Sequence, residues 1–228
     1  MRTSAVHKRT FRTFLLLVFT GFLLNGCAGI DKKLSRNEAQ KINKVKVARS
    51  ECPLLLKETA DSNAAALTGI LFGAIGGAFR GGTCYKMMED NGREVQQNCS
   101  LPDYSKLVMD QFVKRAAQEL SSWPKMEVEN NPVEKDFKYS SGYLLLLRVT
   151  LLKLKNGDGF VAVSTARLVD PGNETVWKKK HEYESNKFNR TCRLKELEAN
   201  KGKLLHEEYH FAAKEAVTTF INDLNAPE

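Results

Sequence analysis

Two strand-like runs separated by an Asn-Gly pair constrain the fold of this chain more than any other feature. Tyr143–Leu154 is rich in leucine, and Phe160–Val169 alternates between two sets of side chains. Asn156-Gly157, between them, is the pair that the tightest β-hairpin turns prefer. The two runs are therefore predicted to be the arms of one antiparallel hairpin.

Two amphipathic helices are predicted, one before and one after this hairpin in the sequence. The first begins at Asp103, a residue suited to capping a helix, and runs to about Leu120. The second spans about 203–224. Their inward faces contain Val108, Phe112, Val113, Ala116 and Leu120 in the first helix, and Leu205, Tyr209, Ala212, Ala213, Ala216, Val217, Phe220, Ile221 and Leu224 in the second.

Short extended segments complete this part of the chain. Met126 and Val128 alternate as a short strand, and Thr175-Val176-Trp177 resumes extended structure after the hairpin. The order helix, strand, hairpin and terminal helix predicts an α+β domain over residues 103–228. We expect a small antiparallel sheet with two packing helices.

The N-terminus has the composition of an export signal. Its basic residues precede an apolar run of eleven residues, Phe14–Leu24, and no acidic residue comes before Asp31. Eleven residues are too few to cross a bilayer, for which about 20 are needed. This part is therefore predicted to direct export and not to belong to the fold.

The next residues, Leu24-Asn25-Gly26-Cys27, resemble the lipobox of bacterial lipoproteins. The resemblance implies a signal peptide over residues 1–26, acyl chains such as palmitate on Cys27, and membrane lipid as a partner. Ala28 is not the aspartate that retains lipoproteins in the inner membrane, which implies an outer-membrane anchor facing the periplasm. An ordinary secretory signal beside an incidental cysteine and an uncleaved anchor are the alternatives.

Charge argues against nucleic acid as a partner. The whole chain carries 35 Lys+Arg against 27 Asp+Glu, a formal charge of +8. Loss of residues 1–26 removes four of the basic residues, which leaves 202 residues with 31 Lys+Arg against 27 Asp+Glu. A periplasmic protein with this small excess of basic residues is not expected to bind nucleic acid.

Residues 27–44 are polar and are predicted to be a tether. Seven Lys/Arg and two acidic residues lie between Asp31 and Arg49, which suits either a basic collar against acidic headgroups or a solvated linker. A first strand is expected around 44–50, followed by a turn near Pro53. It opens a middle part of the chain, residues 45–102.

An uncharged stretch of eighteen residues, Ser62–Phe79, contains small residues at every fourth position. On a helix these residues would form one groove without side chains, against which a second helix can pack as membrane helices do. Eighteen helical residues extend about 27 Å, close to the thickness of a thin bilayer core. The residues of the groove are Ala65, Gly69, Gly73, Gly77 and Gly81.

This pattern resembles the glycine-zipper segments of outer-membrane lipoproteins, including the conjugal surface-exclusion family. The resemblance implies a hydrophobic glycine-zipper helix that precedes the α+β domain. Such a helix would insert into the membrane, lie on its surface or self-associate into a homo-oligomer. The alternative is a glycine-rich helix or loop buried within a soluble fold.

Four cysteines remain once Cys27 is acylated, an even number in an oxidising compartment. Three disulfide pairings are open, and the four residues are Cys52, Cys84, Cys99 and Cys192. The local pairing of Cys84 with Cys99 would close a polar loop with a turn at Asn91-Gly92 and would leave Cys52 for Cys192. Free thiols and a zinc–thiolate site are the alternatives, and the absence of a CxxC spacing disfavours zinc.

One literal catalytic motif is present, since His206-Glu207-Glu208-Tyr209-His210 matches H-E-x-x-H. On a helix, His206 and His210 would face one way and could bind Zn²⁺, with Glu207 as the base. Ala216 stands where the longer zinc-protease motif has its third histidine. A solvated helix face that carries Glu207, Glu208 and the two histidines would contain the same residues. We predict no enzyme, no cofactor and no metal site, with a lipid-anchored zinc metalloprotease as the alternative.

The order of elements in the last part of the chain also resembles the small domains of curli-secretion lipoproteins and of lipoproteins auxiliary to ABC-type transport. The residues that carry this resemblance are Arg167-Leu168-Val169-Asp170 followed by Trp177. It implies a structural, assembly or transport-accessory role, with an outer-membrane protein or a second copy as partner. A plain ligand-binding domain on a tether is a third hypothesis.

Overall fold

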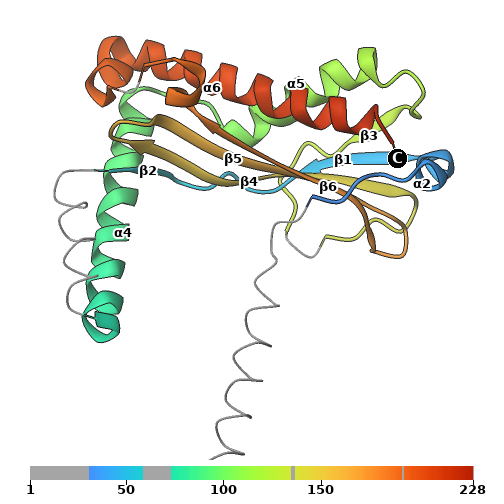
Figure 1. Ribbon diagram of the computed structural model, residues 1–228, viewed down its shortest axis with the longest axis horizontal. Helices are drawn as coiled ribbons and strands as arrows, with labels where there is room; N and C mark the ends of the chain where they lie inside the picture. The colour runs from blue at the N-terminus through green and yellow to red at the C-terminus, as the bar shows by residue number, and fades with distance from the viewer. Residues whose placement is uncertain (1–30, 59–72, 135–136, 192, 228) are drawn as a thin grey trace, which may run out of the picture. The chain divides into compact units, whose positions relative to one another are not determined.

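A sheet covered on one face by two long helices makes up most of the described chain (Figure 1). The structure is a computed structural model that describes residues 31–58, 73–134, 137–191 and 193–227, with the backbone alone for residues 73–84. The unit formed by Lys32–Glu228 combines helices and strands, so the predicted α+β class is confirmed.

The predicted hairpin is the centre of the sheet. Its arms are β4 (Tyr143–Lys155) and β5 (Gly159–Val169), and β6 (Thr175–Glu184) continues the antiparallel pairing. In the turn, Gly157 and Gly159 have φ angles of +92° and +76°, which glycine adopts without strain. The prediction of a hairpin at Asn156-Gly157 is confirmed.

Three further strands extend the sheet in the parallel sense. β1 (Val45–Arg49) runs parallel to β4, and β3 (Met126–Val128) runs parallel to β1. β2 (Leu55–Lys57) pairs with the later part of the same edge of β4. The order is β3-β1-β4-β5-β6, so the sheet is larger and less purely antiparallel than predicted.

Both predicted helices are present and cover one face of the sheet. α5 (Tyr104–Glu119) begins where Asp103 accepts a hydrogen bond from the Lys106 amide at 3.0 Å. The same carboxylate pairs at 2.8 Å with Arg49, a buried residue of β1, so that the cap also joins the helix to the sheet. In α6 (Leu194–Leu224), every residue predicted to face inward is buried.

A break divides α6 near its start. Ala199 is extended, and Asn200, Lys201 and Gly202 follow with φ angles of 53°, 57° and 71°, so the regular helix begins at Lys203 as predicted. A side chain at position 202 would also collide with Cys99, because its Cβ would lie 2.6 Å from Sγ. Gly202 therefore meets a conformational and a steric requirement together.

The predicted tether is wrong from Lys32 onward. Lys32 exchanges two backbone hydrogen bonds with Lys178 of β6, at 2.8 and 2.9 Å, and Leu34 is fully buried. Ser35 then caps α2 (Arg36–Lys41). The neighbouring lysines help to dock the segment, because Lys33 pairs with Asp223 of α6 at 3.2 Å and the Lys32 ammonium donates to the Thr175 carbonyl oxygen.

The predicted loop between Cys84 and Cys99 is also wrong. Residues Gly73–Asn98 form one helix, α4, whose later half packs against β2. At Gly92 the helix backbone approaches the strand so closely that a Cβ would lie 1.8 Å from the Leu55 carbonyl oxygen. Asn91-Gly92 is thus no turn, and the glycine permits the contact of helix with strand.

The opposite face of the sheet is partly covered by the chain between β3 and β4. Val133, Phe137 and Tyr139 pack there on a second apolar cluster. The sheet residues of this cluster are Ala48, Leu144, Leu146 and Val169. β1, β4 and β5 therefore bury side chains on both faces at this end.

Candidate functional site

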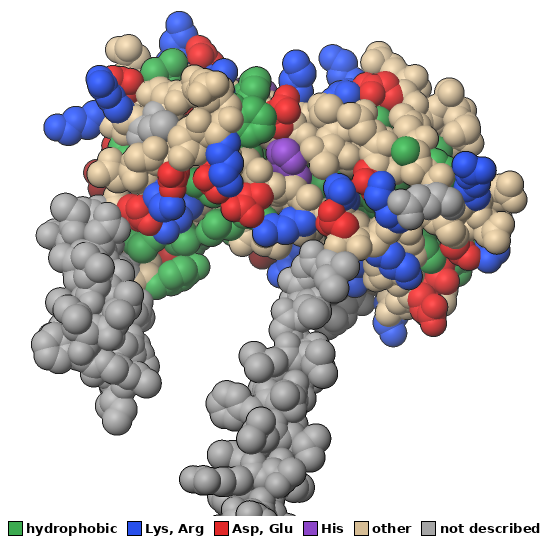
Figure 2. Space-filling model, viewed as in Figure 1, with side chains coloured by type: hydrophobic (Ala, Val, Ile, Leu, Met, Phe, Trp, Pro, Cys, Tyr) green, Lys and Arg blue, Asp and Glu red, His purple; other side chains and the backbone are tan. Residues whose placement is uncertain are grey.

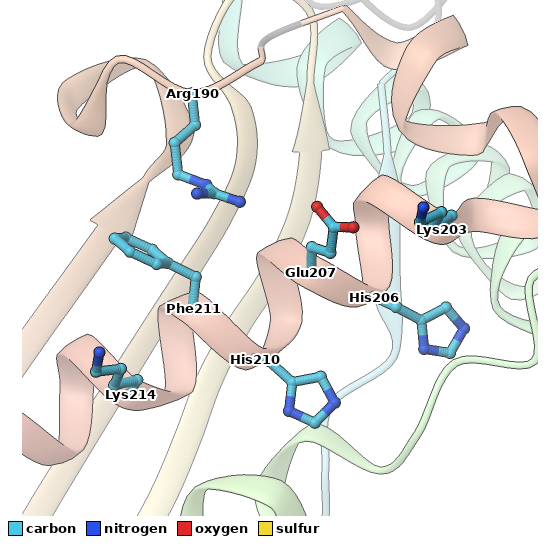
Figure 3. A pocket seen from close by; sticks show the side chains of 7 residues that line it. All are labelled: Arg190, Lys203, His206, Glu207, His210, Phe211 and Lys214. Carbon is cyan, nitrogen blue, oxygen red and sulfur yellow. The ribbon is translucent and has the colours of Figure 1, made fainter.

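The two histidines of the H-E-x-x-H match lie on the outer face of α6 and point to the same side of it (Figure 3). An open pocket of about 770 Å³ runs along this face. It is lined by Arg190, Lys203, His206, Glu207, His210, Phe211 and Lys214. The spacing of the α6 residues is that of a solvent-facing helix stripe.

His206 already has a structural partner. Its Nε2 donates to the carbonyl oxygen of Cys99 at 2.8 Å, so that it caps the C-terminal end of α4. His210 is exposed, and its ring forms no hydrogen bond or ion pair with the described residues. Among the described residues, no group of three His, Cys, Asp or Glu side chains is placed to hold a metal ion.

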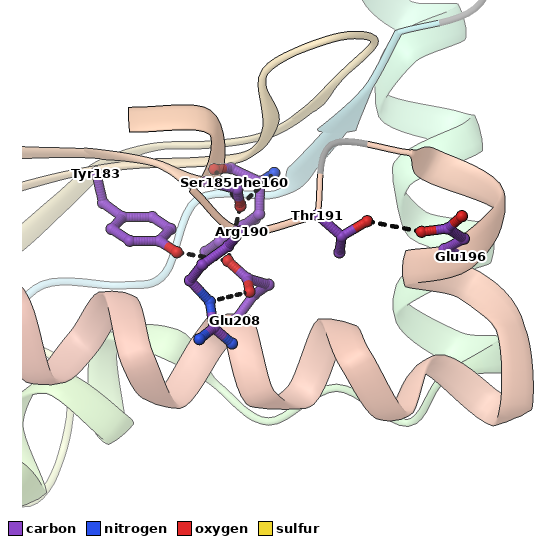
Figure 4. A network of polar contacts seen from close by, with 7 residues as sticks. All are labelled: Phe160, Tyr183, Ser185, Arg190, Thr191, Glu196 and Glu208. Atoms are coloured by element: carbon purple, nitrogen blue, oxygen red, sulfur yellow. Dashed lines mark hydrogen bonds and ion pairs between the residues drawn. The ribbon is translucent and has the colours of Figure 1, made fainter. Parts of the chain in front are cut away.

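The two glutamates of the motif have opposite environments. Glu207 is exposed, whereas Glu208 is 1% exposed, so the prediction of a solvated face is wrong for Glu208. Glu208 accepts hydrogen bonds from Tyr183 at 2.5 Å and Ser185 at 2.7 Å, and its other oxygen pairs with Arg190 (Figure 4). The glutamate that was predicted to lie on a solvated helix face is the one that organises this region.

The network around Glu208 joins four elements. Ser185 opens the short 3-10 helix η1 (Ser185–Phe188), and its hydroxyl also contacts both backbone polar groups of Phe160 in β5. Burial, with the hydrogen bond to Glu208, raises the pKa of the Tyr183 hydroxyl far above its usual range. The donors all satisfy a buried carboxylate, which is the arrangement of a structural clamp between β5, β6, η1 and α6.

An aromatic group borders the same region. The Arg190 guanidinium lies 4.5 Å from the centre of the Phe211 ring, and Tyr183 stacks on Phe188 at 4.9 Å. Phe188 and Phe211 meet edge to face at 5.7 Å. On the face drawn in Figure 2, basic and acidic side chains are interspersed, so no large area of one charge covers it.

His181 is a titratable group inside the contact between β6 and α6. Its Nδ1 donates to the Thr219 hydroxyl at 2.9 Å, because that hydroxyl donates to the Glu215 carbonyl. Its Nε2 is buried, with no partner among the described residues. Burial lowers the pKa of His181 below 6.5, against a smaller opposing effect of Glu182.

This burial predicts a loss of stability in acid. Between its lowered folded pKa and the ordinary pKa of the unfolded chain, the unfolded chain binds more protons, so stability falls as the pH is lowered below about 6.5. Denaturation midpoints measured at several pH values should fall with pH, and His181→Leu should flatten that slope. His210→Gln, an exposed control, should leave it unchanged. Equal slopes for wild type and His181→Leu would contradict the prediction.

The glycine-zipper residues lie only partly within the described chain. Ala65 and Gly69 fall outside it, as does Cys27, whereas Gly73, Gly77 and Gly81 occupy the first turns of α4, where the backbone is helical as predicted. No helix in the described ranges is both long and apolar enough to cross a membrane.

The local disulfide pairing is not formed in this structure. Cys84 lies within α4 and Cys99 directly follows it, and fifteen helical residues separate the two by about 22 Å, beyond the reach of a disulfide. Of the described cysteines, Cys52 and Cys99 carry free thiols, and Cys192 lies outside the described residues. Burial raises the pKa of the Cys52 thiol, against a smaller effect of the Ser105 amide.

No known protein family matches the sequence, and no curated protein matches it. Two solved structures of the PelC dodecamer from Paraburkholderia phytofirmans are similar at 13% identity and a TM-score of 0.32. The alignments cover 88% and 82% of this chain and 94% and 91% of those chains. A TM-score this low carries no inference about function.

Proposed function

We propose that this chain is a lipid-anchored outer-membrane lipoprotein with a structural, assembly or transport-accessory role. The observation that carries the proposal is the lipobox-like Leu24-Asn25-Gly26-Cys27 at the end of a basic and apolar leader. The folded unit supports it, because it begins at Lys32, five residues after Cys27. A leader can therefore be removed at Cys27 and leave Lys32–Glu228 entire.

The motif on α6 favours a non-catalytic role over the metalloprotease alternative. His206 donates its Nε2 proton to the Cys99 carbonyl oxygen, which leaves Nδ1 as the one ring nitrogen that could bind a metal ion. Glu208 is committed to the clamp with Tyr183, Ser185 and Arg190. These contacts explain His206 and Glu208 as parts of the fold.

Self-association is the second element of the proposal. The first half of α4 carries Gly73, Gly77 and Gly81 at helical four-residue spacing, and such spacing lets two helices approach closely. α4 packs on β2 through its later half, around Gly92. A second copy is the partner that we infer for the glycine-lined half.

Acylation of Cys27 can be tested directly. In cells grown with an alkyne analogue of palmitate, the wild-type chain should incorporate the label and fractionate with outer membranes. Cys27→Ala should lose the label by about tenfold or more, because the thiol that carries the diacylglyceryl group is gone. Cys52→Ala is the matched control, since it removes a cysteine of the folded unit and should keep the label. Unchanged labelling of Cys27→Ala would refute the proposal.

A further inference from the structure

Four basic residues lie side by side on the face of the sheet that the helices leave uncovered. The register pairs Arg167 with Lys178 across β5 and β6. Thr165 pairs with Arg148 on one side and with Lys180 on the other. We refer to Arg148, Arg167, Lys178 and Lys180 as the basic sheet face.

Alternation along the strands fixes the direction of these side chains. In β6, Trp177 and Lys179 both bond Asp223 of α6, so Lys178 and Lys180 point away from the helices. In β4, Leu145 and Leu147 belong to the core under the helices, whereas Leu144 and Leu146 belong to the cluster on the opposite face. Arg148 continues that second set and is exposed.

These charges are poorly balanced by the fold itself. Among the described residues, Arg148, Arg167 and Lys178 form no ion pair, whereas Lys180 pairs with Glu182 at 3.1 Å. Other lysines of the sheet are paired, such as Lys46 with Glu129 at 3.8 Å. Like charges directly opposite each other destabilise a sheet. The repulsion between these basic side chains does not stabilise the fold, whereas an anionic surface would neutralise their charge.

The basic sheet face lies close to the anchor along the chain. Lys32 is hydrogen-bonded to the backbone of Lys178 and is the fifth residue after Cys27. Five extended residues span at most about 17 Å. An acylated Cys27 therefore holds Lys32 within that distance of the bilayer surface, and Lys178 at most about one strand spacing further. This step rests on the proposed function.

Aromatic side chains extend the face in a way that suits a membrane interface. Phe137 and Tyr139 are half-buried on the same side of the sheet, beside Leu146, which is the cross-strand neighbour of Arg167. Aromatic rings and basic side chains are the two groups that anchor proteins at the level of lipid headgroups. We propose that the basic sheet face docks on the anionic phospholipid headgroups of the membrane that carries the anchor.

The test compares lysine accessibility on two membranes. The full chain, purified in detergent, is checked for acylation by intact mass and is placed in nanodiscs of phosphatidylcholine, with or without about 30% phosphatidylglycerol. A water-soluble amine-acetylating reagent then labels exposed lysines, and mass spectrometry quantifies each site. We expect the labelling of Lys178 and Lys180 to fall about fivefold in the anionic nanodiscs and to recover in about 0.5 M NaCl. The exposed Lys114 and Lys195 should not change.

Two variants with equal loss of charge complete the test. Arg148→Gln/Arg167→Gln/Lys178→Gln should abolish the protection of Lys180, and Lys114→Gln/Lys125→Gln/Lys195→Gln should preserve it. Equal labelling on both lipids, or equal protection of Lys114, would overturn the proposal, and so would protection in phosphatidylcholine alone. The intact mass tests the lipid anchor separately from the docking of the basic sheet face. A chain without acyl groups would refute the anchor, whereas the docking is tested by the lysine labelling alone.

Discussion

Gly92→Ala is expected to destabilise the folded chain by about 3 kcal/mol, although alanine favours a helix by about 1 kcal/mol over glycine. The added Cβ would lie 1.8 Å from the Leu55 carbonyl oxygen and 2.5 Å from its carbon. Both are backbone atoms of β2, which cannot rotate aside, so α4 has to move off the strand. Urea denaturation followed by circular dichroism measures the loss as a lowered midpoint.

The control for this prediction lies on the same helix. Arg93 is exposed and adjacent, so Arg93→Ala should change stability by no more than about 0.5 kcal/mol. Wild-type stability of Gly92→Ala would mean that α4 does not pack on β2 at this point. A stability gain would mean that helix propensity alone acts at position 92.

Glu208→Ala is expected to cost about 3 kcal/mol, because the buried donors of Tyr183 and Ser185 lose their acceptor and Arg190 loses its ion pair. The side chain of Arg190 is 30% exposed and can turn to water, which keeps the cost at the lower end for a broken buried pair. Thermal and urea unfolding of the purified chain measure the effect.

The neighbouring glutamate is the matched control. Glu207→Ala removes the same side chain from an exposed position and should change stability by no more than about 0.5 kcal/mol. Equal destabilisation by the two substitutions would show that the clamp around Glu208 does not contribute. Loss of a hydrolytic activity in Glu207→Ala without loss of stability would instead support the metalloprotease alternative.

Sequence patterns predicted the parts of the fold that depend on local periodicity. The hairpin followed from Asn156-Gly157 between two strand-like runs, and the buried face of α6 followed from the spacing of Leu205 to Leu224. The cap at Asp103 was predicted as well, although its ion pair with Arg49 was not. Such features depend on residues that are close together in the sequence, so they can be predicted from a single sequence.

Features that depend on distant contacts were missed or misread. Gly92 resembled a turn glycine because its real neighbour, Leu55, lies far away in the sequence. Leu34 stood alone among polar residues, and nothing nearby showed that it would be buried. In the candidate site, the H-E-x-x-H match indicated Glu207 as the functional glutamate. In the structure, Tyr183, Ser185 and Arg190 bond Glu208 instead. No local pattern marks which of two adjacent glutamates will be buried.

The pairing of β4 has a consequence for the order of folding. One edge of β4 meets β5 across a short turn, whereas the other meets β1, in which Val45 pairs with Tyr143, 98 residues further on. Short-range pairing is fast, and closing a connection of about a hundred residues is slow. The β4–β5–β6 meander is therefore expected to form first and the pairing of β1 with β4 last. Until that segment arrives, β4 has an unpaired edge, which is the interval in which the nascent protein is most exposed to pairing with another chain.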